Sequence, residues 1–463
     1  MKRLFSLLLA VLMIFALVSC NMGGENTGDT STNTSTNTST NTSTNTSTYV
    51  PDYSKDLTPY KLLIGPGNTT YTYLNETLSY PTIAKYKDGK KAALSMTFDD
   101  ANNIHAGEIL NEIFAKYNGE VRGTIMATVN FMKGSVPGGT EQDAINAWQN
   151  VFDQGYLDLG CHGYTHDDPS NYASASEERL YAEIGSAIEY LRENFPNQKV
   201  LTYATPLARI NNNYERYLRQ YCIANRLEAG GDLAEIGEEF NPYRIHAKMI
   251  EEDTNLLPIY ESFDNSVKDE RWVVHLYHDI IEDDASSGWN PTTRSTFARY
   301  CERLYTQYAD TVWFGSFEEV ALFAQQYEHV SVELTGISRN SITLNVDSDL
   351  EDKATNGIPV AVNLQLPRFT DSAIAIINGE IQQLELDKSN ANKVTTIIKN
   401  VPVNDTEVLV LIGGNNRFTN TCIHSYSMDS VIQPTEESYG YTLHRCSKCD
   451  CTYQTHFVAY KPE

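Results

Sequence analysis

The fold is decided by the stretch AALSMTFDD at residues 92–100, an apolar run that ends in two carboxylates. Two later stretches repeat this design, LDLGCHGYTH at 157–166 and WVVHLYHD at 272–279. Each is typical of a buried strand whose C-terminal end opens into a polar loop. Active sites of (β/α) barrels are built at the C-terminal ends of the strands. The three stretches therefore predict one shared site.

Five polar side chains stand at or just after these strand ends: Asp99, Asp100, His162, His166 and His278. Asp100, His162 and His166 form a two-histidine, one-carboxylate set of the kind that binds a divalent metal and leaves positions open. Asp99 and His278 remain to move protons. The constellation predicts metal-assisted hydrolysis.

The spacing of these residues limits how each can act. Two histidines four residues apart lie on one side of a helical turn or converge across a tight loop, and Gly163 helps the backbone to bend. Adjacent residues on a strand point to opposite faces, so Asp99 is not expected to be a second ligand beside Asp100. From a strand end, Asp99 can still reach a water as general base. Taken alone, an Asp-Asp pair is equally typical of a turn or a helix cap.

Three motifs within these stretches resemble those of the polysaccharide deacetylases, the NodB-homology group of carbohydrate esterase family 4. Residues 97–100 (TFDD) are similar to the family's T-F-D-D motif, residues 162–166 (HGYTH) to its H-x-x-x-H motif, and residues 276–278 (LYH) to its L-x-H motif. The three occur in the family's order. The resemblance covers about residues 91–328.

This resemblance implies a distorted (β/α)7 barrel and a role for each matched residue. Asp100, His162 and His166 would hold the metal. Asp99 would be the general base, and His278 would protonate the leaving nitrogen. The expected ion is zinc, although nitrogen and oxygen ligands also accept cobalt, nickel or iron.

Two departures from the family pattern concern residues around the site. The family's Arg-x-Pro motif, whose arginine orients the catalytic Asp, is matched by residues 203–206 (YATP), which contain the proline and no arginine. Arg209 or Arg226 is the candidate replacement. The family's Asp-Trp motif, which supports the catalytic histidine, has no clear counterpart, and Asp232 is the candidate there.

Helical and strand patterns alternate across residues 91–328, as a parallel barrel requires. Residues 106–117 and 177–193 have the helical spacing of Leu, Ile and Ala, and Ser174 or Ser176 is placed to cap the second helix. Residues 312–314 (VWF) predict a late buried strand, and residues 317–327 predict a final helix.

The chain begins with features of an exported lipoprotein. Residues 1–19 carry two positive charges and a short apolar run, and the sequence up to Cys20 resembles a bacterial lipobox. An ordinary secretory signal with a chance cysteine is the alternative. Residues 20–50 contain a repeated Ser-Thr-Asn-Thr pattern that predicts a flexible stalk, and residues 51–90 predict an N-terminal extension. We expect a lipid-anchored protein at the cell membrane or outer membrane, facing the extracytoplasmic side.

The formal net charge of −25 argues against nucleic acid as a partner. The expected partners are an acetylated polysaccharide and, through the anchor, membrane lipid. Cys161, Cys222 and Cys301 lie in the barrel region without the spacing of a disulfide framework, so we expect buried thiols.

Two smaller regions follow the barrel. Residues 329–415 alternate β-branched and polar residues and predict a β-sandwich, which is either a spacer or docking domain or a carbohydrate-binding one. Residues 416–463 are rich in Cys and His. Two ligand pairs there predict a zinc knuckle, a second and purely structural site; they are Cys422 with His424 and Cys446 with Cys449. Disulfides are the alternative in an exported protein.

These observations predict a metal-dependent hydrolase that removes acetyl groups from an N- or O-acetylated polysaccharide at the cell surface. Chitin, peptidoglycan, xylan and a host glycan all fit as substrates. A glycan-binding protein that keeps the barrel but turns over weakly is one alternative, favoured by the missing arginine. Another metal-dependent amidase on the same barrel is a third possibility.

Overall fold

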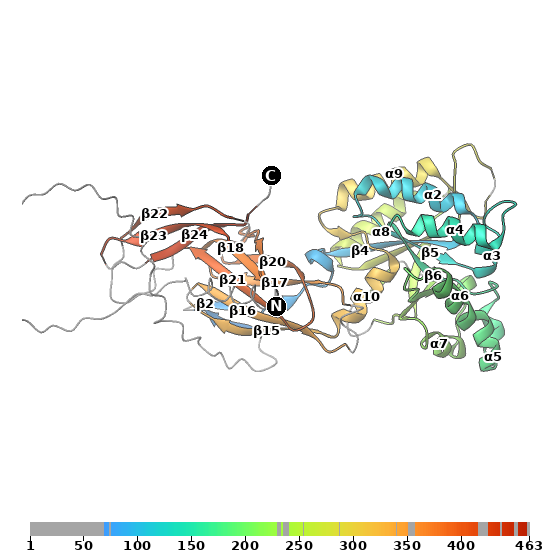
Figure 1. Ribbon diagram of the computed structural model, residues 1–463, viewed down its shortest axis with the longest axis horizontal. Helices are drawn as coiled ribbons and strands as arrows, with labels where there is room; N and C mark the ends of the chain where they lie inside the picture. The colour runs from blue at the N-terminus through green and yellow to red at the C-terminus, as the bar shows by residue number, and fades with distance from the viewer. Residues whose placement is uncertain are drawn as a thin grey trace, which may run out of the picture.

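The computed structural model describes residues 69–460, with gaps at 74–75, 229–232, 235–239, 253, 287, 339, 351–356, 415–424, 436–437 and 449–451. The predicted signal peptide, Cys20 and the stalk lie outside the described residues. So do Asp232, Cys422, His424 and Cys449. Figure 1 shows two parts, one of mixed helices and strands and one built of strands. Among the described residues no helix is long and apolar enough to cross a bilayer.

The first part is a closed ring of seven parallel strands, which confirms the predicted (β/α)7 barrel. In order around the ring they are β4 (Ala92–Asp100), β5 (Gly123–Ala127), β6 (Leu157–Cys161), β7 (Thr202–Ala204), β8 (Ala224–Glu228), β10 (Ile245–Met249) and β11 (Trp272–Tyr277). The ring closes where β11 pairs with β4, with Trp272 opposite Ala93 and Tyr277 opposite Phe98. All nine residues of β4 are buried, which explains its continuous apolar run, since a barrel strand is covered on both faces.

Short strands flank this ring. They are β9 (Leu233–Ala234), β12 (Ile280–Ile281), β13 (Thr292–Thr293) and β14 (Val312–Trp313). The last corresponds to the predicted late strand, and it pairs with the beginning of β4.

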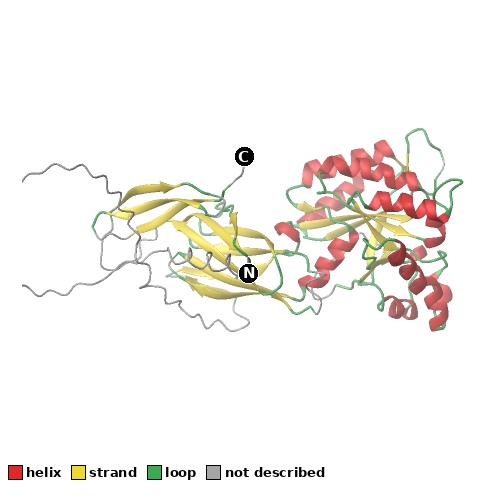
Figure 2. Cartoon of the chain, in the orientation of Figure 1, coloured by secondary structure: helices red, strands yellow, loops and turns green. Residues whose placement is uncertain are grey.

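Helices cover the outside of the barrel (Figure 2). The α-helices are α2 (Ile104–Phe114), α3 (Val129–Lys133), α4 (Glu141–Phe152), α5 (Glu177–Leu180), α6 (Ser186–Asn194), α7 (Asn212–Leu218), α8 (Leu256–Lys268), α9 (Arg294–Tyr308) and α10 (Phe317–Tyr327). The shorter turns are η1 (Lys87–Gly89), η2 (Ala115–Tyr117), η3 (Pro169–Tyr172), the π turn η4 (Tyr181–Gly185) and η5 (Pro206–Ala208).

The helix predicted at 177–193 is present but interrupted. It begins after Ser176, whose side chain accepts a hydrogen bond from the Arg179 backbone nitrogen. The π turn η4 then separates α5 from α6 and buries the side chain of Glu183. Such one-turn widenings of helices frequently occur at functional sites.

The N-terminal end of the barrel is closed by α10 and a network of charged side chains. Ser316 and Glu319 form a capping box at the start of α10. Arg122 pairs with Asp158 at 2.6 Å and with Glu319 at 2.8 Å, and the Ser316 hydroxyl donates to Asp158. The backbone nitrogen of Leu201 donates to the carboxylate of Glu318. Each of these carboxylates therefore has a cation or a hydrogen-bond donor beside it, although Nε of Arg122 is buried without a partner among the described residues.

The second part consists of two sheets that share a buried core. One sheet has the order β15 (Val330–Ile337), β16 (Ser341–Ser348), β21 (Thr406–Gly414), β18 (Thr370–Ile377) and β19 (Glu380–Gln383), and the other has β20 (Val394–Val401), β17 (Val360–Leu366) and β3 (Thr82–Ile83). Side chains such as Leu344, Val362, Ala373 and Val410 belong to one hydrophobic cluster, as a sandwich requires.

The N-terminal extension is part of this sandwich. Its strand β3 pairs with β17, and it also forms a hairpin of β1 (Thr70–Tyr73) and β2 (Glu76–Ser79). The core of the sandwich continues into the barrel, since Trp272 and Phe317 join the same hydrophobic cluster. Gln326 of α10 exchanges two hydrogen bonds with the backbone of Ile358. The two parts therefore pack against each other.

The C-terminal region forms a three-stranded antiparallel sheet of β22 (Tyr426–Ile432), β23 (Gly440–Cys446) and β24 (Thr452–Val458). Phe457 packs against Leu409 and Leu411 of the sandwich. Of the four predicted zinc ligands only Cys446 lies among the described residues; it is buried, and its sulfur accepts from the backbone nitrogens of Ser425 and Lys448 at 3.4 Å.

Candidate metal centre and active site

The three strand ends predicted to share a site surround one cleft of about 460 Å³. All five predicted polar residues line this cleft, and so does Arg226; the five are Asp99, Asp100, His162, His166 and His278. They come from β4, from the end of β6 and from the end of β11. The barrel thus brings together residues that are up to about 180 positions apart in the chain.

Asp100, His162 and His166 form a compact cluster within this cleft. Each offers a ligand atom, and these atoms lie within 4.8 Å of one another. The Nε2 atoms of His162 and His166 are 3.8 and 3.9 Å from Oδ1 of Asp100. This oxygen is buried and has no hydrogen-bond partner among the described residues. Because a buried polar atom without a partner is costly, it points to an absent ligand.

His162 is fixed in an orientation suited to metal binding. Its Nδ1 lies 2.7 Å from the carbonyl oxygen of Ala204, to which it donates, so Nε2 is left to face Asp100. Metal-binding histidines are commonly held by such a bond from the other ring nitrogen. Burial lowers the pKa of His162 to about 4, and burial also lowers the pKa of His166. Both rings are therefore neutral near pH 7, the form that binds metal.

The charge balance of the cluster also favours a cation. Burial, with the neighbouring carboxylates of Asp99 and Asp279, raises the pKa of Asp100 to about 7. A carboxylate in this position lacks a compensating positive charge, and a divalent ion would supply one. The donor set, the orphaned oxygen and the charge balance together fit a metal.

Asp99 also faces the cleft, as its predicted role as general base requires, whereas simple strand alternation would place it on the face opposite Asp100. Its Oδ2 lies 3.5 Å from Nε2 of His162, on the same side as Asp100. The physical reason is that β4 ends in a left-handed turn, with φ of 77° at Asp100 and 55° at Ala101. This turn redirects Asp100 out of the pleat, so two successive carboxylates point the same way.

Arg226 is the arginine that holds Asp99. Its Nη2 donates to both carboxylate oxygens at 2.5 and 2.6 Å, and both side chains are buried. Burial alone would raise the pKa of Asp99, but Arg226, with His162 and His278, outweighs burial and keeps this pKa below its usual value. Arg226 lies on β8 directly opposite Ala204 of β7. The YATP segment, which begins in β7, lacks the family's arginine. Arg226 takes its place from the neighbouring strand β8, at the register position opposite Ala204.

The other arginine candidate, Arg209, is wrong for this role. Its side chain is 65% exposed and pairs with Asp168 at 2.6 Å. It follows η5 on the surface, where the chain has already turned away from the barrel interior.

His278 also lines the cleft, just after β11, the strand that pairs with β4. Its Nδ1 is buried and has no hydrogen-bond partner among the described residues. The next residue, Asp279, accepts a hydrogen bond at 2.7 Å from the backbone nitrogen of Trp289. By contrast, His275 is fully buried and contacts the hydroxyl of Tyr300 at 2.7 Å, so it is a packed histidine outside the cleft.

Glu183 is a supporting residue that sequence reasoning missed. Its carboxylate accepts from the backbone nitrogens of Thr165 and Asp167 and from the Thr165 hydroxyl, which holds the loop that carries His162 and His166. A Cβ at Gly163 would meet this carboxylate at 2.5 Å, which explains the glycine. The sequence does indicate that Glu183 is buried, because helical spacing places it beside the apolar residues Leu180 and Ile184.

Three exposed apolar side chains at the mouth of the cleft were also missed. Phe131, Leu207 and Trp289 are 38%, 53% and 64% exposed, and all three line the cleft. We call them the apolar rim. An exposed apolar cluster beside a polar centre is typical of a ligand-binding surface.

Comparisons with known proteins agree with the motifs. Residues 86–224 match the family model described as polysaccharide deacetylase. The predicted family resemblance is confirmed over these residues. The matched range contains Asp99, Asp100, His162 and His166 and ends just before Arg226. A search of curated proteins finds no match to the sequence.

Several solved structures are similar to about half of this chain. One is a CE4 family pseudoenzyme from Bacillus anthracis, with 14% identity over 50% of this chain and 66% of that chain and a TM-score of 0.33. Another is a peptidoglycan deacetylase from Bacillus subtilis, with 13% identity over 51% and 93% of the two chains and a TM-score of 0.32. A third is a family 4 carbohydrate esterase from Streptomyces lividans in complex with acetate, with 12% identity over 49% and 93% and a TM-score of 0.30.

Proposed function

Starting from the polysaccharide deacetylase domain, we propose that this chain is a metal-dependent hydrolase that removes acetyl groups from an N- or O-acetylated polysaccharide. The observation that carries the proposal is the buried cluster of Asp100, His162 and His166, in which Oδ1 of Asp100 has no partner among the described residues. Beside it stands Asp99, held by Arg226.

Asp100, His162 and His166 would hold the ion. A divalent metal bound there supplies a Lewis acid for the acetyl carbonyl and lowers the pKa of water. Zinc is our first choice because two imidazoles and one carboxylate form a common zinc set.

Asp99 is the general base in this proposal. Arg226 keeps its carboxylate ionised at neutral pH, so it can accept a proton from the attacking water. The same guanidinium fixes the direction of the carboxylate, since both oxygens accept from one nitrogen. A carboxylate held in this way loses less conformational entropy when it adopts the orientation needed for proton transfer.

His278 is the general acid that protonates the leaving nitrogen. It lines the same cleft as Asp99 from the neighbouring strand, so both side chains can reach one bound substrate. Its Nδ1 has no hydrogen-bond partner among the described residues, so this nitrogen is free to contact a bound substrate.

The apolar rim supports a glycan as substrate. Pyranose rings present apolar C–H faces between their polar edges, and Phe131 and Trp289 offer flat apolar surfaces beside the cluster. The cleft is open at this rim, so a polymer can pass across it.

The glycan-binding alternative rested on the missing arginine. Arg226 supplies that contact from β8, which removes the main reason to expect weak turnover. The test is acetate release by the full chain from acetylated chitin, peptidoglycan and xylan, before and after chelation and after metal is restored. Acetate release that is lost on chelation and regained when metal is restored supports the metal-dependent hydrolase. Binding without release by the metal-loaded chain favours the alternative.

We also propose that lipid on Cys20 anchors the protein at the membrane, facing outward. The lipobox and stalk support this proposal. Membrane fractionation of the Cys20→Ala protein tests it, since unchanged processing and unchanged membrane association would contradict it. The structural zinc on Cys422, His424, Cys446 and Cys449 stays a prediction, which would fail if a Cys449→Ser chain kept the full metal content of the parent.

A further inference from the structure

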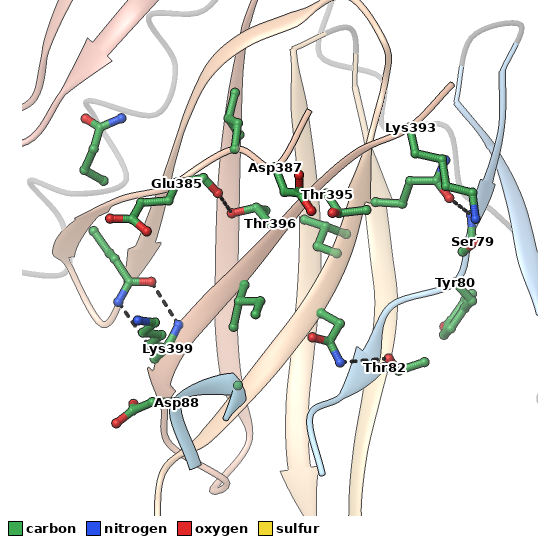
Figure 3. Close-up of a pocket in the computed structure, with 18 of the residues that line it drawn as sticks. Ser79, Tyr80, Thr82, Asp88, Glu385, Asp387, Lys393, Thr395, Thr396 and Lys399 are labelled. Carbon is green, nitrogen blue, oxygen red and sulfur yellow. Dashed lines mark hydrogen bonds between the residues drawn. The ribbon is translucent and has the colours of Figure 1, made fainter. Parts of the chain in front are cut away.

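A second and larger cavity lies on the sandwich, away from the metal centre. It measures about 760 Å³. Its floor is the outer face of the sheet formed by β20, β17 and β3, and its walls come from the segment after β19 and from η1. Figure 3 shows Thr395 near the middle, with Thr82 and Ser79 on one side and Lys399 and Glu385 on the other. We call this cavity the sandwich groove.

The floor of the groove is built by strand register. Asn363 of β17 stands opposite Thr82 of β3 and Ile397 of β20, which forms one row across the sheet. Two residues along, Gln365 stands opposite Thr395. Side chains two residues apart on a strand share a face, so these rows present amides and hydroxyls together on the outside of the sandwich.

Several of these polar groups are held in place yet keep capacity for a ligand. The Oε1 atom of Gln365 accepts from the backbone nitrogen of Ser79 at 2.9 Å, while no hydrogen bond among the described residues uses its amide nitrogen. Gln382 and the backbone of Lys399 exchange two hydrogen bonds at 3.2 and 3.0 Å. Oδ1 of Asp88, in the wall, is buried without a partner in the described chain. Such preorganised donors and acceptors lower the cost of binding.

The side chains that line the sandwich groove favour some classes of ligand over others. Only three aliphatic side chains line it, Leu364, Leu386 and Ile397, so an apolar molecule is disfavoured. Four carboxylates face two lysines, so a phosphate-rich polymer is disfavoured as well. The amides and hydroxyls of the lining fit a hydroxyl- and amide-rich ligand, which is the chemistry of a glycan.

We propose that the sandwich groove binds a neutral glycan chain and anchors the polymer on which the barrel acts. This proposal rests on the proposed function for the identity of the polymer. It decides between the two roles that the sequence left open for the β-sandwich in favour of carbohydrate binding.

The position of the groove defines what it can do. Asp88 and Gly89 precede the N-terminal end of β4, whereas Asp100 ends that strand. At about 3.3 Å per residue, β4 separates the two sites by about 26 Å or more. A short oligosaccharide cannot reach both sites. A polymer can, so the groove raises the effective concentration of polymer at the cleft.

The test compares a groove variant with a matched control on the other sheet. The groove variant is Asn363→Ala with Thr395→Ala. The control is Asn345→Ala with Thr343→Ala, which changes the same residue types on β16, outside the groove. Binding of the full chain to soluble glycol chitin and to acetylated xylan is measured by titration calorimetry. Acetate release is measured on the polymer and on diacetylchitobiose.

The groove variant should bind the better of the two polymers about tenfold more weakly than the parent, as expected for two lost hydrogen bonds. Its ratio of polymer to dimer deacetylation should fall, while the control matches the parent in both measurements. Parent-like polymer binding by the groove variant would overturn the proposal, as would a parent that binds neither polymer. If no substrate releases acetate but polymer binding still depends on the groove, the proposed function fails and this proposal stands.

Discussion

The two ends of the barrel both bury charged groups, but they differ in how those groups are satisfied. At the N-terminal end, Arg122 bridges Asp158 and Glu319, and Ser316 completes the network, so these carboxylates have partners, although Nε of Arg122 is buried without one among the described residues. At the C-terminal end, Asp100 and His278 each keep a buried atom without a hydrogen-bond partner among the described residues. The backbone there is also strained, with left-handed φ values at Asp100, Ala101 and His166.

This difference indicates that the N-terminal end of the barrel contributes mainly to stability and the C-terminal end mainly to function. Satisfied charges hold a structure together, whereas unsatisfied charges cost free energy unless a ligand completes them. We therefore expect variants at the N-terminal end to change unfolding, and variants at the C-terminal end to change metal binding and turnover. Variants at the two ends test whether stability and turnover change independently of each other.

Asp99→Asn should reduce acetate release by about 10²–10⁴-fold, because a positioned general base is worth that much. The variant keeps the shape of the side chain and leaves Asp100, His162 and His166 in place, so metal content should stay at the parental level. Steady-state acetate release and metal analysis on the same sample check both parts. Parental activity would remove Asp99 from the mechanism.

Arg122→Met should lower the free energy of unfolding by about 2–3 kcal/mol, because it leaves Asp158 and Glu319 close together without their shared cation. The turnover number of the folded fraction should not change. Arg209→Met is the control, since its pair with Asp168 is exposed and should contribute less than about 1 kcal/mol. A loss of turnover without a loss of stability would break the separation between the two ends.

Glu318 should make the N-terminal end sensitive to pH. Burial, with the neighbouring Asp158, raises the pKa of Glu318 from its usual 4.5 to about 7. The folded state therefore binds more protons than the unfolded state between these values, so this group's contribution to stability falls as pH rises from about 4.5 to 7. Glu318→Gln should raise the free energy of unfolding by about 2 kcal/mol at pH 8 and change it little at pH 4.5. Denaturant unfolding at both pH values checks the sign; an equal effect at both would contradict it.

Trp289→Ala should have the smallest effect. Loss of one aromatic surface at the apolar rim should raise KM for a polymer about fivefold and leave kcat nearly unchanged. Leu257→Ala, which removes another exposed apolar side chain away from the cleft, is the control. A parental KM in the Trp289 variant would mean that the rim does not contact substrate.

Much of this molecule could be predicted from the order of its residues. The continuous apolar run of β4 predicted a strand covered on both faces, and the three strand ends predicted which polar side chains meet. Strand alternation did not predict that Asp99 and Asp100 face the same cleft, because alternation ends where Asp100 adopts a left-handed φ, which local patterns do not reveal. Arg209 and Arg226 remained alternatives as the partner of Asp99, because only the pairing of β7 with β8 shows which arginine lies close enough. The apolar rim was missed because the exposure of a single side chain depends on the whole fold.

The central claim is that Asp100, His162 and His166 hold one divalent ion at the C-terminal end of the barrel. It is tested most directly by the metal content of the purified parent, of His162→Ala and of His105→Ala, which changes an exposed histidine outside the cleft. We expect His162→Ala to contain one metal ion per chain fewer than the parent, while His105→Ala contains the same number. A His162→Ala protein with the parent's full metal content would contradict it.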